Sequence, residues 1–295
     1  SAWCSIASST ASQRHDPMPI VSRPDFLPQL PSWSRKALFA LALSAICFTF
    51  AFPVLWLMLT SVRPESGVYY VHRGTEFTLG NVAEVLRDDR IVEAFVNSAL
   101  IATLATVFSL LVTVSSGYML SRFTGPASRI WFGTIYVFRC VPYISWVLPL
   151  YFVTQSWGIY DTYLGLLLPH VAVHICFFSW LMKGFFDGID PSMEYAAMID
   201  GCSRWGAFVR VAVPSALPAI SALAVLCWLF TWNEFLFALI LTGNRVPMIT
   251  VVMAQFVTEM GLRWNLMAAT AVMALVPAFL LALFGQKYVI RGLRI

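Results

Sequence analysis

The chain has 295 residues, of which 59% are hydrophobic and 12% are charged, and its mean hydropathy is +0.75. A water-soluble domain carries about 25% charged residues, so this composition excludes a soluble globular domain and a disordered chain. The six cysteines are spread thinly and fall mostly in apolar runs, which excludes a small disulfide-stapled module. The net charge of +4 is too small and too dispersed to indicate a nucleic-acid partner. A polytopic membrane protein remains.

Six apolar segments are long enough to cross a bilayer as helices, which requires about 20 residues each. The segments are continuous, whereas the strands of a membrane β-barrel would alternate between polar and apolar residues. Prolines inside several segments do not argue against helices, because neighbouring helices can satisfy the backbone groups that proline frees. We therefore predict an all-α fold with six transmembrane helices, over residues 37–62, 95–120, 130–155, 163–182, 211–242 and 266–289.

The loops between these segments differ in positive charge. If the N-terminus is cytoplasmic, the cytoplasmic segments contain twice as many Lys and Arg residues as the external ones. Because positive charge concentrates on the cytoplasmic side, the sequence predicts a multi-pass protein of the bacterial cytoplasmic (inner) membrane with both termini inside. Residues 1–35 are polar and contain prolines, so we expect a poorly ordered cytoplasmic segment there and a transmembrane domain over residues 36–295.

The loop after the fourth predicted span, at about 183–213, has the pattern of two short helices joined by a turn. The first helix is expected to run to about Ile199, and the second is expected to end before Pro214. Two interpretations remain open: the hairpin lies on the membrane surface, or its small residues form a docking element for another protein. The expected capping and turn residues are Asp190, Pro191, Gly201 and Ser203.

This loop resembles the cytoplasmic loop of permease subunits of ATP-binding-cassette (ABC) importers. The family motif is E-A-A, three residues, G, nine residues, I, one residue, L-P. Tyr195 stands at the position of the motif's glutamate, and Glu194 directly precedes it. Either Glu194 takes over the glutamate's role from the neighbouring position, or the groove of the partner differs. The matching residues are Tyr195-Ala196-Ala197, Gly201, Val211 and Val213-Pro214.

The resemblance extends over roughly residues 36–293. Over this range the chain is similar to MalG-like permease subunits of carbohydrate (maltose-type) importers. These subunits are inner membrane components of binding-protein-dependent transport systems. It implies the type I ABC importer permease fold, with six transmembrane helices and a cytoplasmic coupling helix. The residues that carry it are Asn97-Ser98, Ser121-Arg122-Phe123, Pro142, Pro149-Leu150-Tyr151, Trp232-Asn233-Glu234-Phe235, Trp264 and Asn265–Ala269.

The resemblance also implies a mechanism, in which a separate ATPase dimer closes on ATP and moves the 190–206 loop. The spans then alternate between two access states and import a sugar or oligosaccharide. The implied partners are a second, MalF-like permease, two ABC ATPase subunits, an extracytoplasmic solute-binding protein and membrane lipid. The implied ATPase-coupling residues are Glu194, Tyr195, Ala196, Ala197, Asp200, Gly201 and Cys202.

The chain contains no G-x-x-x-x-G-K-[ST] phosphate loop. We therefore expect that it is not an enzyme and binds no cofactor. ATP and magnesium would be held by the partner ATPase subunits.

Ionisable residues inside spans are costly and are therefore candidates for function. Arg139 could contact an anionic substrate, whereas Glu234 lies either near the translocation path or in a hydrogen-bonded helix interface. His170 and His174 share one helix face, but two histidines make an incomplete metal site, so no metal is predicted. The candidates for the translocation path are Arg139, Asn233, Glu234, Tyr143 and Trp146.

Two other classes of membrane protein are alternatives. A secondary transporter driven by an ion gradient would transport without nucleotide, and the match of the 183–213 loop argues against it. An intramembrane protease would need a G-x-S-G-type nucleophile or an H-E-x-x-H zinc motif, and the sequence contains neither.

Overall fold

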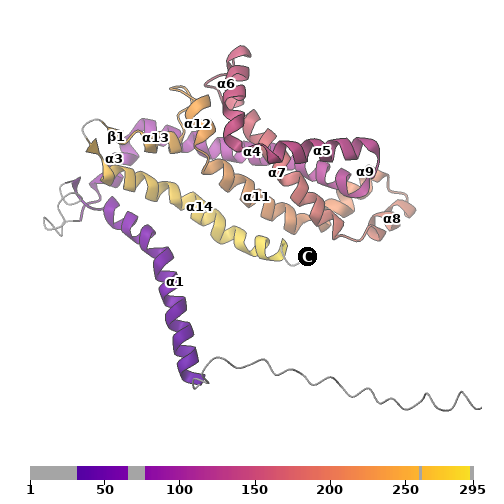
Figure 1. Ribbon diagram of the computed structural model, residues 1–295, viewed down its shortest axis with the longest axis horizontal. Helices are drawn as coiled ribbons and strands as arrows, with labels where there is room; N and C mark the ends of the chain where they lie inside the picture. Colours follow the sequence, from indigo (N-terminus) through magenta and orange to yellow (C-terminus); the bar gives the residue numbers. More distant parts are fainter. Residues whose placement is uncertain (1–31, 66–76, 259–260, 293–295) are drawn as a thin grey trace, which may run out of the picture. The chain divides into compact units, whose positions relative to one another are not determined.

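The computed structural model describes residues 32–65, 77–258 and 261–292 (Figure 1). The chain forms two compact units, divided between Phe52 and Pro53. The described part of the first unit belongs to helix α1 (Ser32–Ser61), where large apolar side chains such as Phe39 and Phe50 are exposed. A helix with exposed apolar side chains is typical of a segment surrounded by lipid. The poorly ordered segment predicted for residues 1–35 lies almost wholly outside the described residues.

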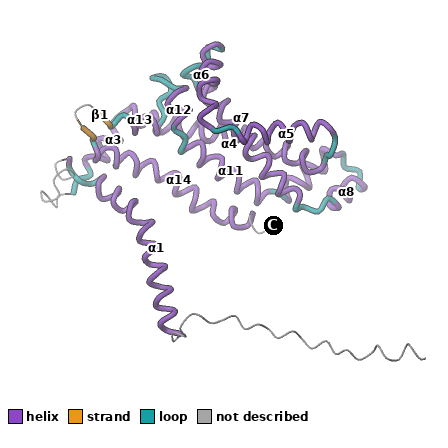
Figure 2. The backbone as a smooth tube through the Cα atoms, viewed as in Figure 1, coloured by secondary structure: helices purple, strands orange, loops and turns teal. Residues whose placement is uncertain are grey.

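The second unit is built around two long helices, α4 (Asp89–Arg122) and α7 (Tyr163–Asp187), which pack along each other. Helix α11 (Leu217–Trp232) packs on α4, and α14 (Trp264–Gly292) packs on α11. Helix α5 (Pro126–Cys140) lies against α7 (Figures 1 and 2). The unit is thus a helical bundle with α4 at its centre.

Small residues on α4 allow this close packing. Helices in lipid associate without a hydrophobic driving force, so they rely on short interhelical distances between small side chains. A Cβ atom added at Gly117 of α4 would lie 2.7 Å from the Cβ atom of Met182 in α7, closer than atoms can approach. The buried small residues of α4 are Ala94, Ser98, Ala102, Ala105, Ser109, Ser116 and Gly117.

The span predicted over residues 130–155 is a bent pair of helices rather than one continuous helix. Helix α5 ends at Cys140, a 3₁₀ turn follows over Tyr143–Trp146, and helix α6 (Val147–Ser156) continues at a bend of 104°. Pro142 has no backbone N–H and forces the preceding Val141 out of the helical region, to φ −73° and ψ 127°. The sequence contained this proline, but its effect on the helix direction was not predicted.

The predicted span over residues 211–242 is also interrupted. Helix α11 ends at Trp232, and α12 (Leu236–Leu241) begins after a non-helical stretch at Asn233–Phe235. Before α11, the helical turns of residues 204–215 meet it at a bend of 73°. The polar Asn233-Glu234 pair interrupts the apolar pattern and supplies side-chain hydrogen bonds at the break.

Short elements complete the second unit. Within the described residues, four helices are long and apolar enough to cross a membrane, or up to six if each of two bent pairs counts as one span. This agrees with the predicted all-α membrane fold, apart from one antiparallel pair of strands of two residues each. The short elements are α3 (Gly80–Arg87), α13 (Ile249–Ala254), and the antiparallel strands β1 (Val257–Thr258) and β2 (Gly261–Leu262).

Gly117→Ala tests the packing of α4 on α7. We expect it to lower the thermal stability of the purified protein, because overpacking costs about 1–3 kcal/mol. The matched control is Gly133→Ala in α5, where an added Cβ has no neighbour within 4 Å. The measurement is the midpoint of thermal unfolding in detergent, followed by size-exclusion chromatography. Equal midpoints for the two variants would contradict the close α4–α7 contact.

Candidate functional site

The 183–213 loop forms the predicted helical hairpin. Helix α8 runs over Ser192–Ile199, and the backbone N–H of Ser192 donates to Oδ1 of Asp190 at 2.9 Å. This hydrogen bond holds the pKa of the Asp190 carboxyl below its usual value. Gly201 follows with φ +93°, and Ser203 Oγ caps helix α9 (Arg204–Ala207) by accepting from the Gly206 N–H at 3.1 Å.

The predicted end of the second helix before Pro214 is wrong. Helical structure continues through a π-helical turn at Phe208–Ala212 and helix α10 (Val213–Ser215). The N–H of Val213 donates to the carbonyl of Phe208, five residues earlier. A proline lacks the N–H for the usual helical hydrogen bond, and the widened π turn just before Pro214 lets the chain stay helical.

One face of the hairpin exposes apolar side chains. Ala196, Asp200 and Gly201 are also exposed, whereas Ala197 and Cys202 are half-buried. An exposed apolar surface on a loop outside the membrane is typical of a protein-docking site. We call Met193, Tyr195, Ile199 and Trp205, which are 52%, 59%, 86% and 69% exposed, the apolar patch of the hairpin.

Glu194 lies on the opposite face of α8 and is 4% exposed. Its Oε1 atom accepts from Nε of Arg122 at 3.0 Å, and its Oε2 atom accepts from the hydroxyl of Tyr118 at 2.6 Å. Both partners belong to α4, Arg122 being its last residue. Tyr195, in contrast, points outward. The two neighbouring residues therefore have different environments, and Glu194 is directed at the chain's own helices.

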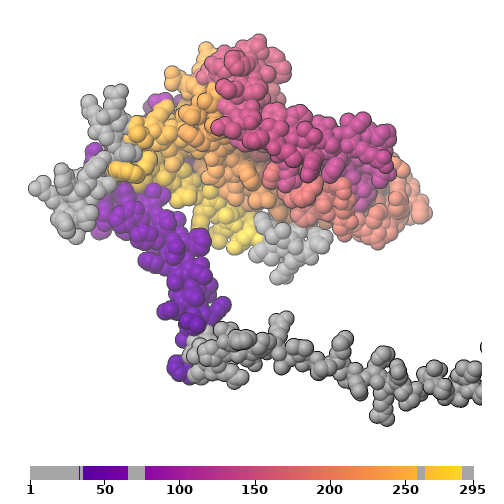
Figure 3. All heavy atoms as spheres, in the orientation of Figure 1, coloured from indigo at the N-terminus to yellow at the C-terminus, as the bar shows by residue number. Residues whose placement is uncertain are grey.

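Arg139 lies at the end of α5, next to the break at Pro142. Its guanidinium lies over the ring of Phe177 at 4.9 Å and over that of Trp180 at 4.4 Å, both in α7. Among the described residues, no carboxylate lies within 4.0 Å of it, and its side chain is exposed on the second unit. Figure 3 shows α5 and α6 on the surface of this unit. An exposed arginine at membrane depth requires water, a partner subunit or an anionic ligand around it.

Glu234 caps helix α12. Its two carboxylate oxygens accept from the N–H groups of Phe237 at 2.9 Å and Ala238 at 3.2 Å. The Nε2 atom of His170 in α7 lies 3.8 Å from Oε2 of Glu234. The carboxylate thus satisfies backbone groups that the break in the helix leaves free, which favours the interpretation of Glu234 as a hydrogen-bonded group at a helix interface.

The other candidates for the translocation path lie near Arg139 or Glu234, but the five candidates do not form one cluster. Asn233 donates from Nδ2 to the carbonyl of Leu229 at 2.7 Å and so caps the end of α11. The Tyr143 ring stacks on Phe237 with a centroid distance of 4.5 Å, beside the Glu234 cap. Trp146 packs on Phe138 of α5, at 5.1 Å between ring centroids.

Asn97 and Ser98 position the segment before α13, a role that the sequence analysis did not assign. Nδ2 of Asn97 donates to the carbonyl of Pro247 at 3.1 Å, and the Tyr163 hydroxyl donates to Oδ1 of Asn97 at 2.8 Å. Ser98 Oγ accepts from the N–H of Ile249 at 2.9 Å. The signal available in the sequence was the placement of this polar pair near the start of a predicted span.

Asp161 positions the loop after α12 by similar hydrogen bonds, and the sequence did not predict this role. Its carboxylate accepts from the N–H groups of Gly243 at 2.7 Å, Arg245 at 3.0 Å and Val246 at 3.2 Å. Asp161 itself has φ +55°, an uncommon conformation for a non-glycine residue. The two loops are about 80 residues apart in the chain, so no local pattern could have indicated this contact.

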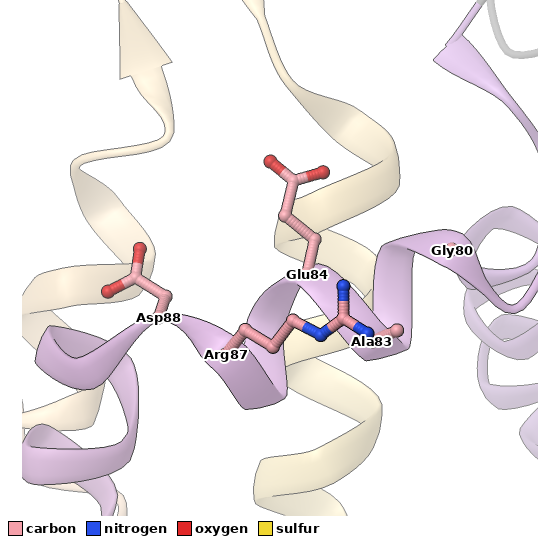
Figure 4. Close-up of a pocket in the computed structure, with 5 residues that line it drawn as sticks. All are labelled: Gly80, Ala83, Glu84, Arg87 and Asp88. Carbon is pink, nitrogen blue, oxygen red and sulfur yellow. The ribbon is translucent and has the colours of Figure 1, made fainter.

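A surface hollow beside α3 is not part of these sites. Its lining residues are Gly80, Ala83, Glu84, Arg87 and Asp88, all on or next to one short helix (Figure 4). Glu84 forms an exposed ion pair with Arg263 at 3.1 Å. In the described part of the chain, no three His, Cys, Asp or Glu side chains gather into a metal-binding group.

The fold defines the class of protein: a polytopic helical membrane protein with a helical hairpin between α7 and α11. Residues 105–295 match the family described as binding-protein-dependent transport system inner membrane component. A probable ABC transporter permease protein of Sinorhizobium fredii is 32% identical over 264 residues, covering 88% of this chain and 94% of the relative. The trehalose transport system permease protein of Mycobacterium tuberculosis is 29% identical over 265 residues, covering 88% and 97%.

The fold agrees with a solved structure. A bacterial ABC transporter involved in the import of the acidic polysaccharide alginate contains a chain that superposes with a TM-score of 0.74 at 20% identity, covering 89% of this chain and 99% of that one. The chain therefore belongs to the family of binding-protein-dependent transport system inner membrane components and is a permease component of an ABC importer. This confirms the family resemblance and disagrees with the gradient-driven alternative.

Gly201→Val tests the turn of the hairpin. A branched side chain is strained at φ +93°, so we expect ATP-dependent uptake to fall to background while membrane insertion stays normal. The matched control is Gly158→Val, at another positive-φ glycine (φ +68°) with equally open surroundings outside the hairpin. Uptake is measured in cells and insertion by membrane fractionation. Normal uptake by the Gly201→Val variant would show that transport does not require the conformation of this turn.

Proposed function

We propose that the chain is the MalG-like permease subunit of an importer for a sugar or oligosaccharide, driven by separate ATPase subunits. The observation that carries this proposal is the two-sided hairpin. Its apolar patch is exposed, while Glu194 fixes the opposite face to α4. A loop held this way can dock into a partner and transmit its movement. Relatives named for trehalose transport and alginate import support a saccharide as the substrate.

In this proposal, the partner that receives the hairpin is one subunit of an ABC ATPase dimer. ATP and magnesium are bound there, and this chain binds no cofactor. The contact residues are Tyr195, Ala196, Ala197, Asp200, Gly201 and Cys202, which lie on α8 and in the turn after it. Tyr195 presents an aromatic side chain where the family motif has a glutamate, so the partner groove would accept an apolar or hydrogen-bonding ring there.

A second, MalF-like permease would complete the membrane unit. The support is the surface of α5, where Arg139 and apolar neighbours such as Tyr136 and Val137 are exposed. We propose that Arg139 faces either this second permease or the translocation path between the two subunits. Asn233, Glu234, Tyr143 and Trp146 would shape that path from the broken helices. An extracytoplasmic solute-binding protein would deliver the sugar, with both termini of this chain in the cytoplasm.

Site-directed crosslinking tests the docking of the hairpin. Ile199, at 86% exposure, is replaced by cysteine in a background without the native cysteines, and membranes that contain the complete transporter are treated with a short photo-crosslinker. Because Ile199 lies in the apolar patch, we expect one product that contains an ABC ATPase subunit, identified by mass spectrometry. The ATPase product should form from a cysteine in the apolar patch and not from a cysteine at an exposed position elsewhere on the chain.

The control is Leu86→Cys in α3, which is 57% exposed but is predicted to lie on the external side. It should give no ATPase product. Absence of an ATPase from the Ile199 product, together with uptake by vesicles that lack nucleotide, would contradict the proposed function.

A further inference from the structure

The cytoplasmic end of α4 carries a buried ionic cluster whose role the family resemblance does not supply. Arg122, the last residue of α4, has a side chain that is 12% exposed. Besides its bond to Glu194, its Nη1 atom donates to the carbonyl of Phe186 at 3.0 Å, and its Nη2 atom donates to the carbonyl of Ile189 at 2.9 Å. One guanidinium therefore joins the end of α4, the end of α7 and the start of the hairpin.

The carboxylate of Glu194 is buried against α4 and turned away from the exposed face of the hairpin. One carboxylate oxygen accepts from Arg122 and the other from Tyr118, and the side chain is 6% exposed. Hydrogen bonds between charged groups in a buried site are strong and geometrically specific. Reaching a partner would require Glu194 to leave both donors and expose the Arg122 charge. Direct contact between Glu194 and a partner is therefore disfavoured.

Aromatic packing extends this cluster to the other arm of the hairpin. The Tyr118 ring lies edge-on to Phe186 of α7 at 5.5 Å and against Phe208 of the π turn at 4.5 Å. Phe186 and Phe208 are both buried. The α7–α8 connection is thus fixed by the hydrogen bonds and the ion pair of Arg122, whereas the arm that leads to α11 contains the π turn and the 73° bend.

We propose that Tyr118, Arg122 and Glu194 form a latch that makes α8 move as one body with the cytoplasmic end of α4. Glu194 is then a positioning residue that acts through Arg122, and Tyr195 is the outward residue at the motif's glutamate position. A displacement of α8 is passed to α4, and through it to α7 and α11, which pack on α4. The latch rests on the proposed function, because it requires α8 to be moved by an ATPase.

The test compares transport with ATP hydrolysis in the reconstituted importer, with its ATPase subunits, second permease and binding protein in liposomes. Glu194→Gln keeps the shape of the side chain but removes the charge that binds Arg122. We expect normal assembly with the ATPase and continued ATP hydrolysis, but about tenfold fewer substrate molecules imported per ATP. Tyr118→Phe removes one hydrogen bond and leaves the ion pair, so we expect a loss of about two- to threefold in the same ratio.

The matched control is Glu84→Gln, which breaks the exposed ion pair with Arg263 and should keep the wild-type ratio. A purely structural weakening would lower assembly and hydrolysis together, whereas loss of the latch lowers only the transport ratio. If the Glu194→Gln variant does not assemble with the ATPase, the Tyr118→Phe variant provides the test. A wild-type number of substrate molecules imported per ATP by Tyr118→Phe would then overturn the latch.

Loss of ATPase binding by Glu194→Gln, with Tyr118→Phe unchanged, would also overturn the latch by making Glu194 a direct contact. That result leaves the proposed function intact. Failure of the unaltered chain to bind any ATPase would instead remove the proposed function.

Discussion

Backbone groups at membrane depth must find partners inside the protein, because no water is available there. The second half of this chain depends on that constraint. Where Asn233–Phe235 interrupts the helix, Glu234 and Asn233 bind the freed backbone groups on either side. The segment before α13 is held by Asn97 and Ser98, and the loop after α12 by Asp161. The break in the helix is thus completed by its own polar side chains, whereas Asn97, Ser98 and Asp161, which are distant in sequence, hold the neighbouring loop segments.

The same constraint changes the meaning of polar residues in the spans. Glu234 is an expensive residue in an apolar segment, and its cost alone suggested a place on the translocation path. In the structure its carboxylate caps α12, which accounts for its presence without a substrate. Arg139 is different, because its guanidinium lies over two aromatic rings and, among the described residues, no carboxylate lies within 4.0 Å of it. Of the candidates for the translocation path, Arg139 therefore has the least structural explanation and the strongest case for a partner or ligand.

The sequence predicted what depends on local patterns. Long apolar runs predicted the helices, and the Asp190, Gly201 and Ser203 spacing predicted the hairpin, since caps and positive-φ turns are set by neighbouring residues. The breaks at Pro142 and Asn233 were missed because apolar length does not show where a helix bends. The orientation of Glu194 was left open for another reason. Its donors Tyr118 and Arg122 lie more than 70 residues earlier, and only the packing of α4 against the hairpin brings them together.

In the proposed latch, coupling depends on the hairpin remaining fixed to α4 while a partner moves its apolar patch. Spin labels at Ile199 of α8 and at the exposed Ser115 of α4 measure this directly, by pulsed electron paramagnetic resonance in the assembled importer without nucleotide and with ATP. The latch predicts that this distance stays the same in both states of the unaltered chain and changes with ATP in Glu194→Gln. A change with ATP in the unaltered chain would show that α8 moves independently of α4 and would contradict the latch.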